Sequence, residues 1–243
     1  MNGKTRKIGC IDLDLLNIQS NCKVLDVGCS EGYISIAFAE LGLKVYGVEP
    51  SEKLIKKFEN KLRNDKELNC FLIKGSAINL PFKDNYFDIV IITEVLEHIQ
   101  ETDRVLEEIY RVLNENGRMC LSVPTSCTEK LFSKLHPKYN KNSGHVKVFR
   151  EKELIELLKR HGFEIYAKRN CNFEWSVFWI IHSILQSDFE FTGTPIENFK
   201  MTKVYWLGWV VLSKIRLKGI VLWIGNKLFP KSIYLYCERI KFE

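Results

Sequence analysis

Apolar residues in the first half of the chain recur as short runs, separated by longer stretches with helical spacing. Short runs apolar at successive positions are typical of strands buried in a parallel sheet. They predict strands at residues 23–27, 44–49, 69–74, 87–93 and 118–123. The stretches between them predict helices at 33–41, 52–62 and 103–113, and a helical stretch from residue 95. Strands and helices that alternate in this way predict an α/β fold with a doubly wound, mainly parallel sheet.

The pattern is weaker at the two ends of the chain. Residues 12–18 leave room for only a turn or two of helix before the first strand, so we expect a short N-terminal cover. Towards the C-terminus the pattern predicts a helix over 151–161, a strand over 163–168 and a strand over 232–240. The 243 residues suit a single α/β domain with an elaboration.

The composition excludes few classes of protein. A net charge of +6 suits an anionic partner, either a membrane surface or a nucleic acid, and suits a solvated basic surface equally well. The eight cysteines form no C-x-x-C pair, which argues against a zinc site and a disulfide framework. The N-terminus has no signal-peptide apolar region, so we expect a cytoplasmic protein with reduced thiols.

The turn after the first predicted strand has the glycine pattern of a ligand-binding loop. Its sequence is Gly28-Cys29-Ser30-Glu31-Gly32. A dinucleotide site requires G-x-G-x-x-G, whose second glycine lets the backbone approach a pyrophosphate. Ser30 takes that place and the spacing differs, which favours S-adenosylmethionine over a dinucleotide. A turn with two glycines can also be purely structural.

With Asp26, this stretch resembles the first motif of the class I S-adenosylmethionine-dependent methyltransferases, D-x-G-x-G-x-G. Later segments resemble other signatures of the family in the same order, so that the resemblance covers most of residues 20–170. These segments are Leu80-Pro81-Phe82, Phe87-Asp88, Glu94-Val-Leu-Glu-His98 and Arg111-Val-Leu-Asn-Glu-Asn-Gly117. The resemblance implies S-adenosylmethionine as cofactor and a seven-stranded, Rossmann-like sheet that closes with a sixth strand and an antiparallel seventh. Residues 171–231 would then be a helical insertion between the last two strands of a single domain, residues 1–243.

The resemblance also implies which residues bind the cofactor. They are Asp26, Gly28, Cys29, Gly32, Glu49, Pro50, Ser76, Ala77 and Glu94. Glu49 ends the second strand, where the acid of the family accepts both ribose hydroxyls. Ser76 stands where the family usually has an aspartate that receives the adenine amino group, and it can accept that hydrogen bond only without charge.

Methyl transfer is an in-line displacement for which the protein mainly aligns donor and acceptor. A base is needed only where the nucleophile loses a proton, and His98 and His145 are the candidate catalytic residues. Glu94, Glu97 and His98 are expected on one helix face, a pattern similar to ubiquinone-pathway O-methyltransferases and small-RNA 2′-O-methyltransferases, where it binds magnesium. Many small-molecule relatives carry a similar helix without metal, so we expect no metal.

The predicted insertion contains all five tryptophans of the chain: Trp175, Trp179, Trp206, Trp209 and Trp223. From residue 204 to 231 it has five basic residues and no acidic one, which is typical of an interfacial membrane helix. Lys214, Arg216 and Lys218 interrupt the apolar run before the roughly 20 residues that a span needs. The tryptophans can instead pack the insertion onto the core and wall a substrate pocket. We rank this lid ahead of a membrane contact, and the two are compatible.

Two functions are therefore carried forward. The first is methyl transfer to a small, apolar or lipid-linked acceptor, with possible peripheral membrane contact through residues 171–231. The alternative is a metal-assisted RNA 2′-O-methyltransferase, which the basic balance and the E-x-x-E-H pattern favour. The sequence shows no separate RNA-binding module, so a nucleic-acid partner is not expected. A fold retained only for binding fits least, because the first motif and Glu49 are intact.

Overall fold

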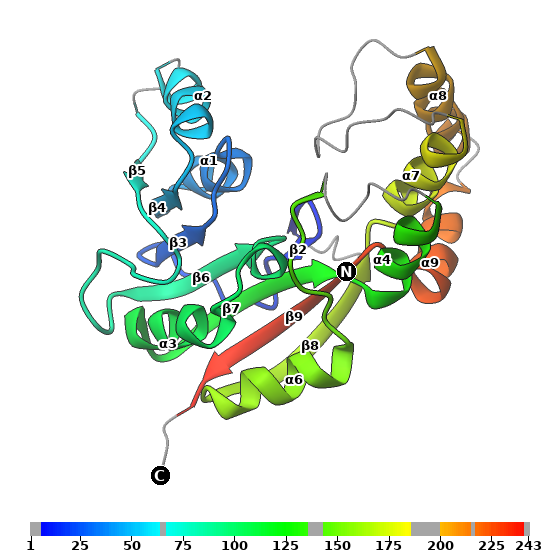
Figure 1. The fold of residues 1–243 in the computed structure, drawn as a ribbon. Coiled ribbons are helices and arrows are strands. Elements are labelled where there is room, and N and C mark those ends of the chain that lie inside the picture. The colour runs from blue at the N-terminus through cyan, green and yellow to red at the C-terminus, as the bar shows by residue number, and fades with distance from the viewer. Residues whose placement is uncertain (1–5, 64–66, 136–142, 186–199, 215–216, 241–243) are drawn as a thin grey trace, which may run out of the picture.

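A seven-stranded sheet forms the centre of the molecule in this computed structural model, which describes residues 6–63, 67–135, 143–185, 200–214 and 217–240 (Figure 1). The strand order is β5-β4-β3-β6-β7-β9-β8. The strands are β3 (Lys23–Val27), β4 (Lys44–Glu49), β5 (Cys70–Lys74), β6 (Phe87–Thr93), β7 (Leu113–Pro124), β8 (Phe163–Cys171) and β9 (Ser232–Arg239). All seven strands that the sequence predicts therefore form one sheet.

Strand directions confirm the predicted fold class. β5, β4, β3, β6 and β7 pair in parallel, whereas β9 lies between β7 and β8 and runs antiparallel to both. The carboxyl ends of β3, β4, β5 and β6 consequently meet at one edge of the sheet. In open α/β sheets this is the edge where ligands bind.

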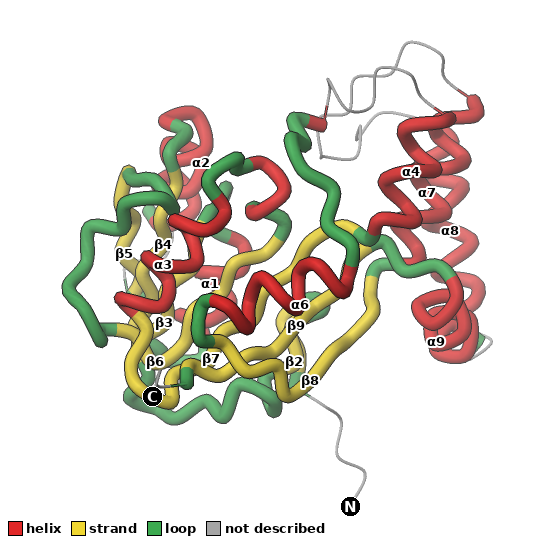
Figure 2. Tube along the Cα trace, turned by 60° about the horizontal axis from the view of Figure 1, so that its bottom comes forward, coloured by secondary structure: helices red, strands yellow, loops and turns green. Residues whose placement is uncertain are grey.

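Helices cover both faces of the sheet, as Figure 2 shows. They include α1 (Tyr33–Glu40), α2 (Glu52–Leu62), α3 (Thr102–Val112) and α6 (Glu151–Arg160), each close to its predicted range. Leu106 of α3 and Leu154 of α6 belong to one buried apolar layer. Phe38 of α1 packs in the other layer, together with Ile11 from the N-terminal segment.

The N-terminal segment differs from the prediction of a short helix. Residues 7–12 form a hairpin of β1 (Lys7–Ile8) and β2 (Ile11–Asp12), whose turn includes Gly9 at φ 57°. The backbone N–H of Asp12 donates to the hydroxyl of Tyr236 in β9, 2.7 Å away. Residues 13–17, where a turn or two of helix was predicted, form turns, in which the N–H of Leu16 donates to the carbonyl of Leu13 at 3.2 Å.

The structure also corrects the helix predicted from residue 95. Only a short 3₁₀ turn, η1 (Leu96–His98), follows β6. Glu94 has the left-handed φ of 54°, which does not belong to a right-handed helix, and the backbone is extended again at Ile99. Helix α4 (Ser126–Leu135) follows β7 and was not predicted.

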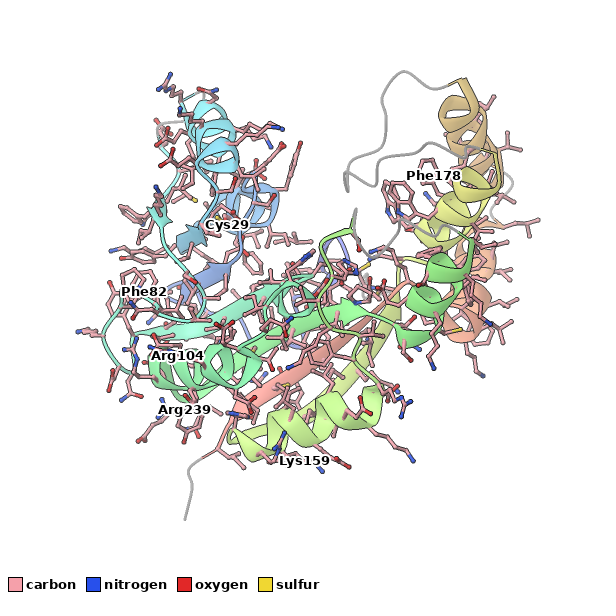
Figure 3. All side chains as sticks on the ribbon, in the orientation of Figure 1. Cys29, Phe82, Arg104, Lys159, Phe178 and Arg239 are labelled. Carbon is pink, nitrogen blue, oxygen red and sulfur yellow. The ribbon has the colours of Figure 1, made fainter. Side chains whose placement is uncertain are left out.

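The described parts of the connection from β8 to β9 form α7 (Phe173–Leu185), α8 (Lys200–Lys214) and α9 (Lys218–Leu228). Figure 1 shows them gathered with α4 at one end of the sheet, away from α1 and α2. Phe132 of α4 packs there with Phe178 and Trp179 of α7, and Figure 3 labels Phe178 in this group. Within the described ranges, no helix has the length and apolar character needed to cross a membrane.

Candidate functional site

The turn between β3 and α1 has a backbone shape that its sequence dictates. Gly28, Ser30 and Gly32 all have left-handed φ angles, of 70°, 51° and 79°. A Cβ on Gly32 would lie 2.2 Å from Cε2 of Phe58, and one on Gly28 would lie 2.4 Å from Cγ2 of Val95. Both glycines are therefore required by their φ angles and by close neighbours.

Glu49 lies directly beside this turn because β3 and β4 are paired. The N–H groups of Gly28 and Cys29 donate to the carbonyl of Val48, at 2.8 and 3.1 Å. The carboxylate of Glu49 accepts from the N–H of Ser30 at 3.0 Å and from that of Ser51 at 2.9 Å. Two backbone donors thus orient a buried carboxylate at the end of β4.

Asp26 has a structural partner inside the protein. Its carboxylate is buried and accepts a 2.5 Å hydrogen bond from the hydroxyl of Ser35 in α1. Burial raises the pKa of Asp26 to about 6, although the hydrogen bond from Ser35 opposes the rise. The side chain joins β3 to α1, which holds the first turn of the helix against the strand.

Cys29 also directs its side chain into the protein. It is buried, and its Sγ would lie 2.7 Å from a Cβ on Gly47 in β4. Figure 3 labels Cys29 at the junction of the turn and the sheet. Burial raises the pKa of this thiol well above its ordinary value, so it stays protonated and packs as an apolar group. Cys29 could therefore contact a cofactor only through its backbone, and this contact stays a prediction.

The loop after β5 completes this edge of the sheet. The N–H of Gly75 donates to the carbonyl of Glu49 at 3.2 Å, which brings the loop against the end of β4. Ser76 forms an isolated bridge with Asn79, and Ala77 is buried. Pro50, after Glu49, is exposed. The structure therefore brings together the turn, Glu49 and residues 75–77, whose contacts with a cofactor stay a prediction.

Glu94 does not share a helix face with Glu97 and His98, because only a short 3₁₀ turn follows it. Its carboxylate accepts from the hydroxyl of Ser122 at 2.9 Å and pairs with the ammonium of Lys231 at 3.0 Å. Ser232 donates to the same carboxylate at 3.3 Å. The left-handed backbone turns this side chain towards β7 and β9. If Glu94 contacts the cofactor as predicted, its carboxylate would bind both the cofactor and Lys231.

A second polar cluster joins η1 to the segment before α6. Glu97, His98 and His145 each offer one ligand atom, and these atoms lie within 4.8 Å of one another. Among the described residues, this is the group that could hold a metal ion, and it contains His145 in place of the expected Glu94. Glu97 is buried, and none of the described residues donates a hydrogen bond to its carboxylate oxygens. Burial and the neighbouring Glu94 raise the pKa of Glu97 well above its usual range.

The two histidines are held in defined orientations. Nδ1 of His98 donates to the carbonyl of Gly144 at 3.1 Å, and Nδ1 of His145 to the carboxylate of Glu129 at 2.8 Å. The centroids of the two imidazole rings are 4.8 Å apart, and the rings pack edge to face. Burial, followed by the neighbouring His145, lowers the pKa of His98. In a neutral ring bonded in this way, Nε2 is the basic nitrogen.

Sequence reasoning missed Glu129 and Lys231. Ser126 and Glu129 have the S-x-x-E spacing of a capping box ahead of apolar residues, and this signal would have predicted α4. Lys231 gave no signal, because it meets Glu94 only through the pairing of β9 with β7.

Part of the chain is similar to a known family of proteins. Residues 25–121 match the family model described as a methyltransferase domain. The stretch includes the turn, Glu49, residues 75–77 and Glu97. Over these residues the chain is similar to methyltransferase domains, in agreement with the resemblance to the class I S-adenosylmethionine-dependent family. The match begins inside β3 and ends inside β7, so it covers the four strands whose ends form the candidate site.

Two curated relatives support the methyltransferase assignment. The chain is 38% identical over 119 residues to an uncharacterized methyltransferase of Schizosaccharomyces pombe, covering 46% of this chain and 43% of the relative. It is 38% identical over 116 residues to a demethylmenaquinone methyltransferase of Geobacillus sp., covering 45% of this chain and 50% of the relative. The chain thus spans about half the length of the curated relatives that it matches.

A solved structure shows the same methyltransferase fold over a longer range. It is a SAM-dependent methyltransferase from Methanosarcina mazei, superposed with a TM-score of 0.64 at 18% identity. The superposition covers 97% of this chain and 100% of that chain.

Proposed function

We propose that the protein transfers a methyl group from S-adenosylmethionine to a small, apolar or lipid-linked acceptor. The observation that carries this proposal is the contiguous site at the ends of β3, β4 and β5. Glu49 is hydrogen-bonded there to both the Gly28–Gly32 turn and Gly75, which begins the loop of residues 75–77. The methyltransferase match covers all three.

The residues at this edge suit the cofactor. Glu49 carries two backbone donors, and no lysine or arginine of the described ranges pairs with it. Its oxygens retain lone pairs for the two hydroxyls of a ribose. Ser76 offers an uncharged acceptor on the next strand end, where an adenine amino group would donate. When bound, S-adenosylmethionine supplies an electrophilic methyl group on a cationic sulfur.

The histidine cluster supplies a base for an acceptor hydroxyl. His145 is oriented by Glu129, the arrangement by which a third group fixes a general base. It would take up the proton that the acceptor hydroxyl loses when its oxygen displaces S-adenosylhomocysteine from the methyl carbon. His98 packs beside it, edge to face, and would position the acceptor. We assign His145 and His98 these roles as part of the proposal.

Two observations favour an apolar acceptor. Several relatives with 37–40% identity are named demethylmenaquinone methyltransferases. In addition, Glu129 lies on α4, whose Phe132 packs against the aromatic residues of α7. The base is thus one helix away from the tryptophan-rich insertion, which would cover the reacting groups as a lid.

Isothermal titration calorimetry tests the cofactor site directly. We expect S-adenosylmethionine and S-adenosylhomocysteine to bind and NAD to be inert. Glu49→Ala should weaken binding by roughly 1.5–3 kcal/mol, about 10- to 150-fold, because a charged acceptor for two hydroxyls is lost. Glu52→Ala is the matched control, since Glu52 lies nearby but is exposed and pairs with Lys74. Tight NAD binding, or equal affinities for the two variants, would contradict the proposal.

A second candidate, the metal-assisted RNA 2′-O-methyltransferase, is favoured by the cluster of Glu97, His98 and His145. The two functions differ in where a labelled methyl group goes. Incubation with S-adenosyl-[methyl-³H]methionine and either total lipid extract or total RNA should label the organic phase, with EDTA having no effect. Label in acid-precipitated RNA that EDTA abolishes and manganese or magnesium restores would establish the second candidate.

A further inference from the structure

Helix α8 carries an apolar stripe that points outward. Leu207, Val210, Val211 and Lys214 are spaced i, i+3, i+4 and i+7, which places them on one face. All four are exposed, and Leu207 exposes 60% of its surface. In a helix of a globular protein, a stripe with this spacing normally faces the core.

Helix α9 repeats the arrangement. Ile220, Trp223, Ile224 and Lys227 have the same spacing and are exposed, and Leu228 extends the stripe. Trp223 exposes 68% of its surface and Leu228 75%. The ammonium of Lys227 lies 5.7 Å from the ring centroid of Trp223.

The opposite sides of both helices make the contacts that hold them in place. Trp209 of α8 is buried and packs edge to face with Tyr205. Gly225 of α9 lies against the ring of Phe173, and the side chain of Asn226 accepts from the N–H of the same residue at 2.8 Å. The described contacts of α8 and α9 are therefore made by the faces opposite the stripes, and exposed apolar surface of this kind marks an interaction site.

Charge indicates the partner. No acidic residue occurs between residues 200 and 231, whereas Lys214, Lys218 and Lys227 are all exposed. Figure 1 places α8 and α9 on the outer side of their helix group, away from the sheet. A second copy of this chain would bring lysines against lysines. An anionic bilayer offers hydrocarbon to the stripes and phosphate to the ammonium groups.

We propose that the outward faces of α8 and α9, Leu207 to Lys214 and Ile220 to Leu228, form a docking surface for an anionic lipid bilayer. Trp223 would lie at the level of the headgroups, where tryptophan is favoured, with the aliphatic side chains below it. The lysines would contact lipid phosphates. The inference does not depend on the proposed function, because it concerns neither cofactor nor acceptor.

Vesicle flotation with the full chain tests this surface. The protein should float with vesicles of phosphatidylglycerol and phosphatidylcholine, and much less with phosphatidylcholine alone. The double variant Ile220→Glu/Trp223→Glu should lose flotation, while Leu41→Glu, an exposed leucine on the far side at 52%, should keep it. Lys218→Gln and Lys227→Gln should each lower the partition coefficient by roughly fivefold, and added salt should do the same.

A second measurement identifies the residue in contact with lipid. Vesicles with brominated acyl chains should quench tryptophan fluorescence of the wild type, and Trp223→Phe should float equally well but lose most of the quenching. Absence of flotation would overturn the proposal. So would equal flotation of the Ile220→Glu/Trp223→Glu variant, or a concentration-dependent dimer in light scattering that this variant abolishes, since the surface would then bind a second copy.

Discussion

Burial disfavours the charged form of Asp26, so this residue should make the stability of the protein depend on pH. The pKa of Asp26 in the folded protein is about 6, whereas the ordinary value for an aspartate is 3.8. A raised pKa for an acid means that its contribution to stability is present below about pH 3.8 and is lost as pH rises to about 6. The loss amounts to about 3 kcal/mol.

Asp26→Asn should remove that loss, because the amide oxygen still accepts from Ser35 and carries no charge. Urea unfolding at pH 4 and pH 7 should show that the variant gains about 2.4 kcal/mol relative to the wild type between these pH values, because part of the full 3 kcal/mol is already lost at pH 4. Asp14→Asn, at an exposed aspartate, should follow the wild type. Parallel profiles for Asp26→Asn and the wild type would show that Asp26 is charged at neutral pH without cost.

The site residues differ in how far the sequence could place them. Glu49 was predictable, because a carboxylate at a strand end occupies a fixed place on the carboxyl edge of the sheet. The partner of Glu94 was not, since Lys231 is 137 positions away in the chain and meets it through the sheet. His98 and His145 were predicted to approach one site, and the structure brings their rings to 4.8 Å. Their catalytic roles stay a prediction.

At the scale of elements, the fit of the β3–α1 turn against α2 depends on Gly32. A Cβ there would lie 2.2 Å from the buried ring of Phe58. Gly42 has a similar left-handed φ of 83°, but nothing lies within 4 Å of its would-be Cβ. Comparing alanine substitutions at Gly42 and Gly32 therefore separates the cost of a left-handed backbone from the cost of steric overlap.

Gly42→Ala should cost roughly 1–2 kcal/mol of unfolding free energy, from the left-handed backbone alone. Gly32→Ala should cost about 1–3 kcal/mol more, since Phe58 must move, and should weaken binding of S-adenosylmethionine. Urea denaturation and calorimetry measure both effects. Equal stabilities would mean that the ring shifts freely, and the turn would then not be fixed by α2.

Periodicity predicted the elements that pack against the sheet and failed where long-range contacts decide the backbone. The strands and the helices α1, α2, α3 and α6 were predictable, because each carries an apolar face at its own period. The helix expected from residue 95 is absent because Glu94 turns left-handed and Val95 packs on Gly28. Helix α4 was missed because its capping signal was not used.

At the scale of the whole molecule, the insertion of residues 171–231 can be removed without breaking the sheet. Cys171 at the end of β8 is paired with Ser232 at the start of β9, so these strands can be joined by a hairpin without residues 173–230. Asn172 already has a left-handed φ of 67°, which suits a tight turn. Lys231 can be kept, and with it the pairing to Glu94.

A variant in which a glycine joins Asn172 to Lys231 should bind S-adenosylmethionine about as tightly as the full chain, because the turn, Glu49 and residues 75–77 all lie outside the deleted segment. It should lose methyl transfer, because the proposed lid is gone, and vesicle flotation, because the apolar faces of α8 and α9 are gone. Phe132→Gln in the same variant replaces a side chain that the deletion would expose, and far-UV circular dichroism checks that the sheet is intact. Full transfer to the native acceptor would show that the insertion is no lid, while loss of cofactor binding in a folded variant would place part of the cofactor site within it.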